Sequence, residues 1–253
     1  MTKIVMHGCN GHMGQVITDI CSSDDEATIV AGVDVNTEAK SGYPVYKSID
    51  DVDVDFDVII DFSHISTTDN LLNYCSKNNK PVVLCTTGLT EDMLAHVDAA
   101  SKEVAVLRSA NMSLGINTLF DLCAKATKIF ADAGFDIEIV EKHHNQKLDA
   151  PSGTALALAD ACNEALEEKY DYVYDRSNRR EKRPVNEIGI SAVRGGNIVG
   201  EHEVIFAGLD EVITIKHTAY SKSVFAKGAV QAAKYLAGKE AGLYDMTNVI
   251  AAK

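Results

Sequence analysis

The sequence predicts an α/β protein with two parts, a doubly wound parallel sheet and then an α+β domain with an open mixed sheet. Three observations predict this fold class. Short runs rich in Val and Ile alternate with longer helical patterns over the first 110 residues. After Asn111 the apolar runs become longer and alternate with period two. The 253 residues, 46% of them hydrophobic, are enough for one large domain or two small ones.

The first part contains five strand-like runs, which are short and apolar, as expected for strands that are buried on both faces. They are residues 3–7, 28–34, 56–61, 81–85 and 104–108. Helical patterns lie at residues 12–22, 66–78 and 90–101. Strand, helix and strand in repetition imply right-handed crossovers, hence a Rossmann-like parallel sheet. We expect a dinucleotide-binding domain over residues 1–112, completed by residues 222–253.

The second part mixes helices with long alternating strands, which are typical of a sheet with one solvated or helix-covered face. Strands are expected at residues 135–141, 186–194, 201–207 and 211–219. Helices are expected at residues 114–133, 154–169 and 221–236, with a charged, Arg-rich loop at 170–184. We expect residues 113–221 to form a domain for substrate binding and oligomerisation.

Composition excludes several classes of protein. The 24% of charged residues is ordinary for a folded chain, which argues against disorder, collagen and coiled coil. The net charge of −13 argues against nucleic acid as the main partner. No apolar run approaches the roughly 20 residues of a membrane helix, and Met1 leads at once into a strand, so we expect a cytoplasmic protein without anchor or signal peptide. The six cysteines form no C-x-x-C pair and favour buried, reduced thiols over a metal site.

A glycine-rich loop, Gly8-Cys9-Asn10-Gly11-His12-Met13-Gly14, follows the first predicted strand and opens the first helix. Glycine permits a tight turn and the close approach of a pyrophosphate, while the helix N-terminus offers unpaired N–H groups and a positive dipole end. The usual dinucleotide pattern is G-x-G-x-x-G, so a glycine-rich turn without a ligand remains an alternative.

Asp34 ends the second predicted strand, 20 residues after Gly14. A carboxylate there accepts hydrogen bonds from the adenosine ribose hydroxyls. Neither residue 35 nor residue 36 is basic, and the nearest cation in the sequence is Lys40. A 2′-phosphate beside an unpaired carboxylate would be repelled, so we predict that NADH is preferred over NADPH. The alternative for Asp34 is an ordinary turn residue at a strand end.

Residues 141–154, with the sequence E-K-H-H-N-Q-K-L-D-A-P-S-G-T, join a predicted strand end to a predicted helix start. His143, His144 and Lys147 are proton-donating groups in one short loop. Ser152, Gly153 and Thr154 offer backbone N–H groups and a hydroxyl at a helix start, which suits a carboxylate. Two alternatives remain. One is a metal site on the histidines, which has no acidic or thiol partner at a supporting spacing, and the other is a structural turn.

This block resembles the E-x-H-H-x-x-K-x-D-A-P-S-G-T-A block of the dihydrodipicolinate reductase family, an enzyme family of bacterial diaminopimelate and lysine synthesis. The resemblance covers essentially the whole chain. Residues 8–14 are similar to the family's G-x-x-G-x-M-G loop, and residues 61–63 to its D-F-[ST] element beside the nicotinamide. Further similar segments are residues 86–88, 110–113, 194–202 and 225–229.

The resemblance implies reduction of 4-hydroxy-tetrahydrodipicolinate to tetrahydrodipicolinate by NADH or NADPH, in a homotetramer that assembles through the second domain's sheet. His143 would donate a proton and Lys147 would act as a second acid, while His144, Gly153 and Thr154 would bind substrate carboxylates. No metal is implied. The cofactor residues implied are Gly8, Cys9, Asn10, Gly11, His12, Met13, Asp34, Phe62, Ser63, Thr86, Thr87, Gly88, Ala110, Asn111, Met112 and Ser113.

Three positions depart from the family's pattern: Cys85 replaces a glycine, Lys222 replaces an arginine, and Asp34 lacks a basic neighbour. Two other functions remain open, namely another NAD-dependent dehydrogenase of a small carboxylic acid and a non-catalytic NADH sensor. Because the protein is acidic and the implied substrate is a dianion, we expect a local cluster of cations, Arg194 among them, to reverse the field at the site.

Overall fold

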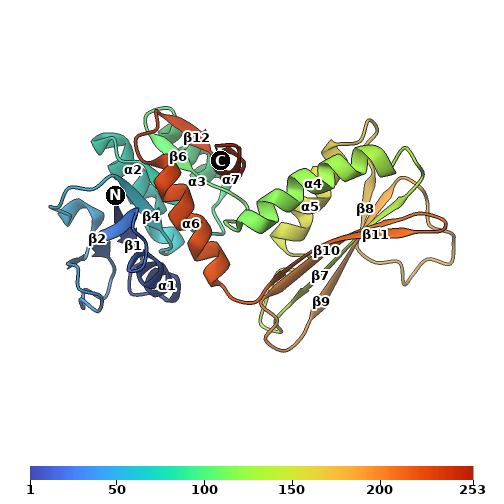
Figure 1. Cartoon of the computed structure of the whole chain (residues 1–253), viewed down its shortest axis with the longest axis horizontal. Coiled ribbons are helices and arrows are strands. Elements are labelled where there is room, and N and C mark those ends of the chain that lie inside the picture. The colour runs from blue at the N-terminus through green and yellow to red at the C-terminus, as the bar shows by residue number, and fades with distance from the viewer. Residues whose placement is uncertain (253) are drawn as a thin grey trace. The chain divides into compact units, whose positions relative to one another are not determined.

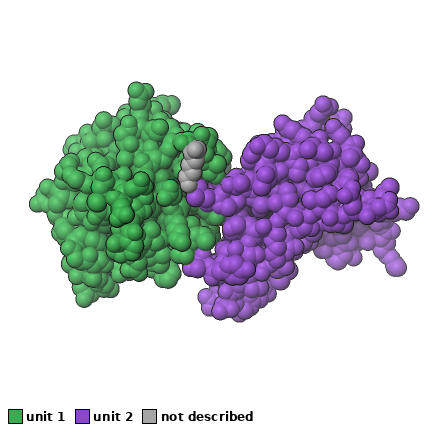
Figure 2. All heavy atoms as spheres, in the orientation of Figure 1, with its two compact units in different colours: residues 1–113, 223–253 green, residues 114–222 purple. Residues whose placement is uncertain are grey.

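The computed structural model describes residues 1–252, which form two compact units (Figures 1 and 2). Unit 1 contains Met1–Ser113 and the C-terminal segment that begins at Ser223. Unit 2 contains Leu114–Lys222. None of the helices in the described part of the chain combines the length and the apolar composition that a membrane crossing requires.

Unit 1 is built on a seven-stranded sheet with the order β12-β6-β5-β4-β1-β2-β3, and every pairing in it is parallel. Its strands are β1 (Thr2–His7), β2 (Ala27–Val33), β3 (Val45–Tyr46), β4 (Val58–Asp61), β5 (Val82–Leu84), β6 (Ala105–Leu107) and β12 (Gly242–Tyr244). The chain proceeds from β1 to β3 in one direction and from β4 to β12 in the other. The strand order therefore reverses between the neighbours β1 and β4, the place where such sheets bind ligands at the carboxyl ends of their strands.

Helices cover both faces of this sheet, as right-handed crossovers in two opposite directions require. They are α1 (His12–Cys21), α2 (Thr68–Asn78), α3 (Glu91–Ser101), α6 (Ser223–Leu236) and α7 (Met246–Ala251), with 3₁₀ turns at Ile49–Asp51 and Ile65–Thr67. Helix α6 packs on α1 and on the central strands, and α2 packs on α3. Fully buried side chains such as Val5, Ile59 and Leu71 form the core, and each such burial stabilises the fold by about 1.5–3 kcal/mol.

Unit 2 is a mixed five-stranded sheet with the order β11-β10-β7-β9-β8 (Figure 1). Strand β10 is antiparallel to β7 and β11, whereas β7, β9 and β8 are mutually parallel neighbours. The strands are β7 (Asp136–His143), β8 (Asp171–Val173), β9 (Glu187–Arg194), β10 (Gly200–Ala207) and β11 (Val212–Ala219). Helices α4 (Leu114–Phe130) and α5 (Gly153–Glu164) pack on each other and against the sheet. The two architectures confirm the predicted fold class.

The buried face of β7 changes character along the strand, and this change positions the site. Residues alternate between partly and fully buried from Asp136 to His143. Ile137 and Ile139 belong to the apolar core with α4 and α5, and they are followed on the same face by Glu141 and His143. A strand that begins as core therefore ends by presenting two buried titratable groups.

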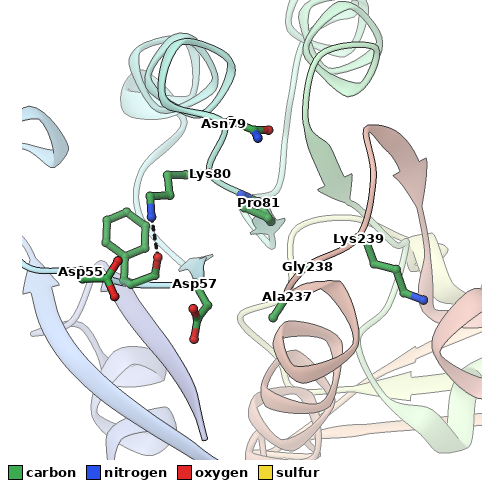
Figure 3. A pocket seen from close by; sticks show the side chains of 9 residues that line it. Asp55, Asp57, Asn79, Lys80, Pro81, Ala237, Gly238 and Lys239 are labelled. Carbon is green, nitrogen blue, oxygen red and sulfur yellow. Dashed lines mark hydrogen bonds between the residues drawn. The ribbon is translucent and has the colours of Figure 1, made fainter.

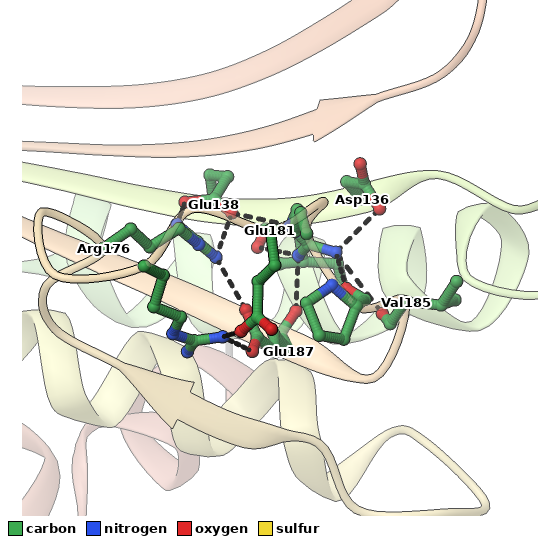
Figure 4. A network of polar contacts seen from close by, with 10 residues as sticks. Asp136, Glu138, Arg176, Glu181, Val185 and Glu187 are labelled. Carbon is green, nitrogen blue, oxygen red and sulfur yellow. Dashed lines mark hydrogen bonds and ion pairs between the residues drawn. The ribbon is translucent and has the colours of Figure 1, made fainter.

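The open face of the same sheet carries an ion-pair network that holds the Arg-rich loop (Figure 4). Arg176 pairs with Glu138 at 2.9 Å and with Glu187 at 3.2 Å, and Arg183 pairs with Glu138 at 2.9 Å. A Cβ at Gly189 would lie 1.9 Å from the Glu138 carboxylate, so glycine makes room for it. The arginines of the loop are thus neutralised by carboxylates of β7 and β9, and these ion pairs fasten the loop to the two strands.

Five elements differ from those expected, and the structure shows a local cause for two of them, β7 and α5. Strand β7 runs past residue 141 to His143, because it keeps pairing with β9 as far as the step His143↔Arg194. Helix α5 ends at Glu164 rather than at 169, where the Asn163 side chain exchanges two hydrogen bonds with the backbone of Tyr170. Strands β3 and β12, of two and three residues, were not predicted, and β8 lies where a loop was expected.

Candidate active site

The glycine-rich loop of unit 1 folds tightly between β1 and α1. Gly8 has φ +85°, and a Cβ there would lie 2.6 Å from the carbonyl oxygen of Phe62. A Cβ at Gly14 would lie 2.3 Å from the Gly8 carbonyl oxygen, so the start of α1 rests directly on the loop. Gly11 is the N-cap of α1 and supplies no side-chain hydrogen bond. The N–H groups of the first helical turn therefore suit an anion.

A pocket of about 210 Å³ opens at this loop, at the carboxyl ends of β1, β2 and β4. Five residues expected at a cofactor site line it, namely Gly8, Gly11, Asp34, Phe62 and Ser63. Glycines that leave no room for a side chain, a helix N-terminus and a carboxylate at the end of β2 are the features expected of a dinucleotide site.

The carboxylate of Asp34 is fixed by two backbone amides. Its Oδ2 accepts a hydrogen bond from Asn10 N at 2.9 Å, and its Oδ1 accepts one from Asn36 N at 3.1 Å. The Asn10 side chain donates to Asn36 O at 2.6 Å and so ties the loop to the segment after β2. Each carboxylate oxygen keeps a second lone pair for a ribose hydroxyl.

A fully buried carboxylate, Asp61, organises the end of β4. It accepts hydrogen bonds from His7 Nδ1 at 2.8 Å, from Ser63 Oγ at 2.5 Å and from Thr86 Oγ1 at 2.6 Å. Three strand ends, those of β1, β4 and β5, are thereby joined, and two expected cofactor residues, Ser63 and Thr86, are placed together. His7 was not predicted, although a histidine at the end of an apolar strand and directly before the glycine loop is a usable signal.

The other residues expected to bind the cofactor do not line the 210 Å³ pocket of the described structure. Thr87 and Gly88 are exposed directly after β5. The segment Ala110–Ser113 lies under α6, where a Cβ at Gly228 would come within 1.7 Å of the Met112 carbonyl oxygen. His12 and Met13 begin α1, and only the backbone of Cys9 is available to a ligand, since its side chain is buried against Gly32.

Cys85, which replaces the family's glycine, does not strain its turn. The only non-glycine residue with a positive φ in the described chain is Asn79, so Cys85 adopts an ordinary backbone. Its N–H donates to the Asp61 carbonyl oxygen at 3.0 Å. Five of the six cysteines are buried, and burial raises the pKa of Cys9 and Cys21 to about 11. No cluster of His, Cys, Asp and Glu in the described residues has the geometry of a metal site.

A second pocket of unit 1, of about 600 Å³, lies at the opposite edge of the sheet, where β4 and β5 begin (Figure 3). Its principal cation is already engaged, because Lys80 Nζ donates to the Phe56 carbonyl oxygen at 2.6 Å and lies over the Phe56 ring. Ligands of doubly wound sheets bind at the other edge, so the size of this pocket does not make it the cofactor site.

In unit 2, the carboxylate of Glu141 is buried with four hydrogen bonds. Arg194 donates two of them, from Nη1 and Nη2, at 2.8 and 2.7 Å. His143 Nδ1 lies at 2.6 Å and Ser152 N at 3.0 Å. Burial raises the pKa of Glu141, but the bonds from Arg194, His143 and Ser152 more than compensate and hold that pKa below its ordinary value. Glu141 is therefore a buried anion that orients three groups.

The carboxylate fixes the histidine that follows it on the strand. An ionised carboxylate only accepts hydrogen bonds, so His143 Nδ1 donates and Nε2 is left for other chemistry. Nε2 lies against Gly200, where a Cβ would stand 3.1 Å away. Burial lowers the pKa of His143, and Glu141 opposes that shift only in part.

A second histidine, His202 on β10, lies edge-on to the His143 ring with centroids 5.1 Å apart. Burial and the nearby His143 lower the pKa of His202 to about 4, so it is neutral near pH 7. Its Nε2 hydrogen bonds to Ser152 Oγ at 2.9 Å. Ser152 is the N-cap of α5, and its Oγ also accepts from Ala155 N. Ser152 was expected only as part of a carboxylate site, and the sequence reasoning gave Glu141 and His202 no role.

The loop that follows His143 is held in place by its backbone. Asn145 N donates to the Gly196 carbonyl oxygen at 3.1 Å, and Lys147 N donates to that of His144 at 3.2 Å. His144 is half-buried, and Lys147 Nζ pairs with Asp149 at 2.8 Å. Gly153 and Thr154 form the first turn of α5, beside the Ser152 cap. The structure thus brings the five expected catalytic and substrate-binding residues to one end of unit 2.

Arg194, which we expected to belong to a local cluster of cations, is ion-paired with Glu141. Both of its amino groups donate to Glu141, and Nη2 also donates to the Asp149 carbonyl oxygen at 2.6 Å. The Arg194 charge is balanced by Glu141, and that of Lys147 is balanced by Asp149. A dianionic ligand would therefore have to replace Asp149 as the partner of Lys147.

Both halves of the chain match models of one family. Residues 2–112 match "Dihydrodipicolinate reductase, N-terminus" and residues 115–250 match "Dihydrodipicolinate reductase, C-terminus". The 4-hydroxy-tetrahydrodipicolinate reductase of Caldanaerobacter subterraneus is 53% identical over 99% of this chain and 98% of its own. The enzyme of the same name from Clostridium novyi is 48% identical over the full length of both chains.

Solved structures show the same fold. The dipicolinate-bound dihydrodipicolinate reductase from Paenisporosarcina sp. TG-14 superposes with a TM-score of 0.79 over 97% of both chains at 23% identity. A probable dehydrogenase from Thermotoga maritima gives a TM-score of 0.57 at 15% identity, over 99% of this chain and 89% of its own.

Proposed function

The chain belongs to the dihydrodipicolinate reductase family and acts as a 4-hydroxy-tetrahydrodipicolinate reductase, and we propose how its residues divide the reaction. The observation that carries this function is the match of both family models across the chain together with full-length relatives of that activity. It removes the two alternatives, a dehydrogenase of another small acid and a non-catalytic sensor. The reaction belongs to diaminopimelate and lysine synthesis.

We propose that unit 1 holds NADH or NADPH, which supplies the hydride when bound. The Gly8–Gly14 loop (Gly8, Cys9, Asn10, Gly11, His12, Met13) and the first turn of α1 would hold the diphosphate, and Asp34 the adenosine ribose. The nicotinamide end would lie along Phe62, Ser63, Thr86, Thr87, Gly88 and the segment Ala110, Asn111, Met112, Ser113. Asp34 favours the 2′-hydroxyl over a 2′-phosphate, so NADH is the preferred cofactor.

In unit 2, we propose that His143 is the proton donor. The substrate's hydroxyl leaves as water, which gives a conjugated C=C–C=N system. Hydride addition to that system drives electrons toward the ring nitrogen, so a proton must be supplied to the product. Glu141 holds His143 Nδ1, which leaves Nε2 as the donating atom, and its negative charge stabilises the imidazolium. A dianionic substrate nearby raises the pKa of His143 from its lowered value, which loads the donor when the substrate binds.

Lys147 would act as the second acid once the substrate displaces Asp149 from it. His144 would bind one carboxylate of the substrate, and the N–H groups and hydroxyl of Gly153 and Thr154 would bind a carboxylate at the start of α5. The dipole of α5 favours an anion at that end. Binding and proton transfer thus use adjacent residues of one loop.

We also propose that the enzyme is a homotetramer in the cytoplasm, assembled through the open face of the unit 2 sheet. This face carries Val193 and Val212, which are exposed, beside the paired charges of Lys142 and Lys216 with Glu201 and Glu203. Light scattering of the purified chain tests the assembly, and a monomer at micromolar concentration would contradict it.

The function is tested by NADH oxidation that depends on the freshly formed aldol product of pyruvate and aspartate semialdehyde. We expect oxidation only when both precursors and the condensing enzyme are present, followed spectrophotometrically. Oxidation that proceeds equally with a simple 2-oxo acid, or none with the aldol product, would contradict the assignment.

A further inference from the structure

We propose that Lys47 binds the 2′-phosphate of NADPH and so makes NADPH a usable second cofactor despite Asp34. The inference rests on the proposed cofactor site of unit 1 and identifies the residue that sets its specificity. The sequence offers no basic neighbour for Asp34 at residues 35–36, but the fold supplies one from another strand.

Lys47 is placed beside Asp34 by the pairing of β2 with β3. The two strands are parallel, and Val33 pairs with Tyr46. Asp34 N continues the ladder by donating to the Tyr46 carbonyl oxygen at 3.0 Å. The next residues of the two chains, Asp34 and Lys47, therefore emerge side by side at the carboxyl edge of the sheet, and both line the 210 Å³ pocket.

The Lys47 ammonium has no partner in the described residues, whereas the cation nearest to Asp34 in sequence, Lys40, has a carboxylate nearby. Among the hydrogen bonds and ion pairs described for residues 1–252, none involves Lys47 Nζ, and the residue is exposed. Lys40 Nζ lies 4.0 Å from Glu38. The Asp34 carboxylate is occupied by the amides of Asn10 and Asn36 and not by a cation. The Asp34 carboxylate and the Lys47 ammonium thus lie at the same edge of the sheet without forming an ion pair with each other.

This pair gives the adenosine end two opposed preferences. A 2′-hydroxyl donates to the Asp34 carboxylate, which favours NADH. A 2′-phosphate is repelled by Asp34 but gains a charge-assisted contact with Lys47, whose long side chain can reach outward from the strand end. His64 lines the same pocket, with its ring fixed by a hydrogen bond from Ser66 N to Nδ1 at 3.2 Å. The site is therefore built to accept both nucleotides, unequally.

The test compares the wild type with Lys47→Ala in direct binding of NADH, NADPH, 5′-ADP and 2′,5′-ADP by calorimetry, without substrate. We expect the affinity for NADPH and 2′,5′-ADP to fall about tenfold, as for loss of one charge-assisted contact, and that for NADH and 5′-ADP to change by less than about twofold. Lys47→Arg should retain the affinity for NADPH, and Lys40→Ala is the matched control. The NADPH affinity of the wild type should weaken with added salt, and that of Lys47→Ala should do so less.

An equal loss for all four nucleotides, or no loss for NADPH, would overturn the role of Lys47. If the wild type reduces its substrate while Lys47→Ala keeps an unchanged ratio of NADPH to NADH affinity, this inference fails and the proposed function stands. If the wild type binds none of the nucleotides, the cofactor site itself is wrong, and the inference falls with it.

Discussion

At the scale of single residues, Glu141 orients His143, the proposed proton donor. Its buried carboxylate satisfies His143, Arg194 and the Ser152 amide at once, so a change there leaves several polar groups unpaired. The type and spacing of His143 and Lys147 predict proton donors. The sequence could not show that Arg194, far along the chain, neutralises Glu141, because that contact depends on the pairing of β7 with β9.

Glu141→Gln should lower kcat by about 10- to 100-fold, the cost of losing a hydrogen bond to a charged group, with NADH affinity unchanged. Because His143 must be protonated to donate, kcat/KM falls as the pH rises through the pKa of His143. Burial lowers that pKa and Glu141 opposes the lowering, so the descending limb should move to lower pH in the variant. Glu201→Gln, on the open face of the same sheet, is the control. A variant with the pH profile of the wild type would refute the positioning role.

Gly200→Ala tests the space around the donor. The new Cβ would stand 3.1 Å from His143 Nε2, so the ring must shift, and small displacements of a catalytic group reduce kcat by about 10- to 100-fold. Gly195→Ala is the matched control, because a Cβ there meets nothing within 4 Å. Equal activity of the two variants would show that the ring position is not critical.

At the scale of elements, the start of α5 joins fold stability to the proposed substrate site. Ser152 caps the helix, donates its N–H to Glu141 and hydrogen bonds to His202. The helix start itself was predictable from the sequence, but the link to β10 was not. Strand β3 was not predictable either, because two residues are too few to show a hydrophobic period. Its pairing with β2 nevertheless brings Lys47 beside Asp34.

Ser152→Ala should destabilise the protein by about 1 kcal/mol, the usual cost of a lost N-cap, and also raise KM for the substrate. Thr90→Ala removes the equivalent cap of α3, where Thr90 Oγ1 accepts from Met93 N, and should cost similar stability without affecting KM. Chemical denaturation and steady-state kinetics on both variants separate the effects. A common change in KM would mean that the cap acts only through stability.

At the scale of the whole molecule, the sequence was sufficient for the two architectures but not for the charges at the site. Alternating apolar runs identify a parallel sheet and a mixed sheet because burial imposes those periods. The partner of Arg194 could not be predicted from the sequence, because its ion pair with Glu141, 53 residues away, forms only when β7 and β9 pair. The two cations nearest His143 in unit 2, Lys147 and Arg194, therefore each have a carboxylate partner.

The most direct test of the account is a spectrophotometric assay of the wild type, His143→Ala and Lys147→Ala, with the NADH dissociation constant measured on the same preparations. The account predicts that each substitution lowers kcat by about 10²–10⁴-fold, the usual worth of one placed acid, while the dissociation constant for NADH stays unchanged. Variants that keep the kcat of the wild type, or that lose activity only because NADH no longer binds, would contradict it.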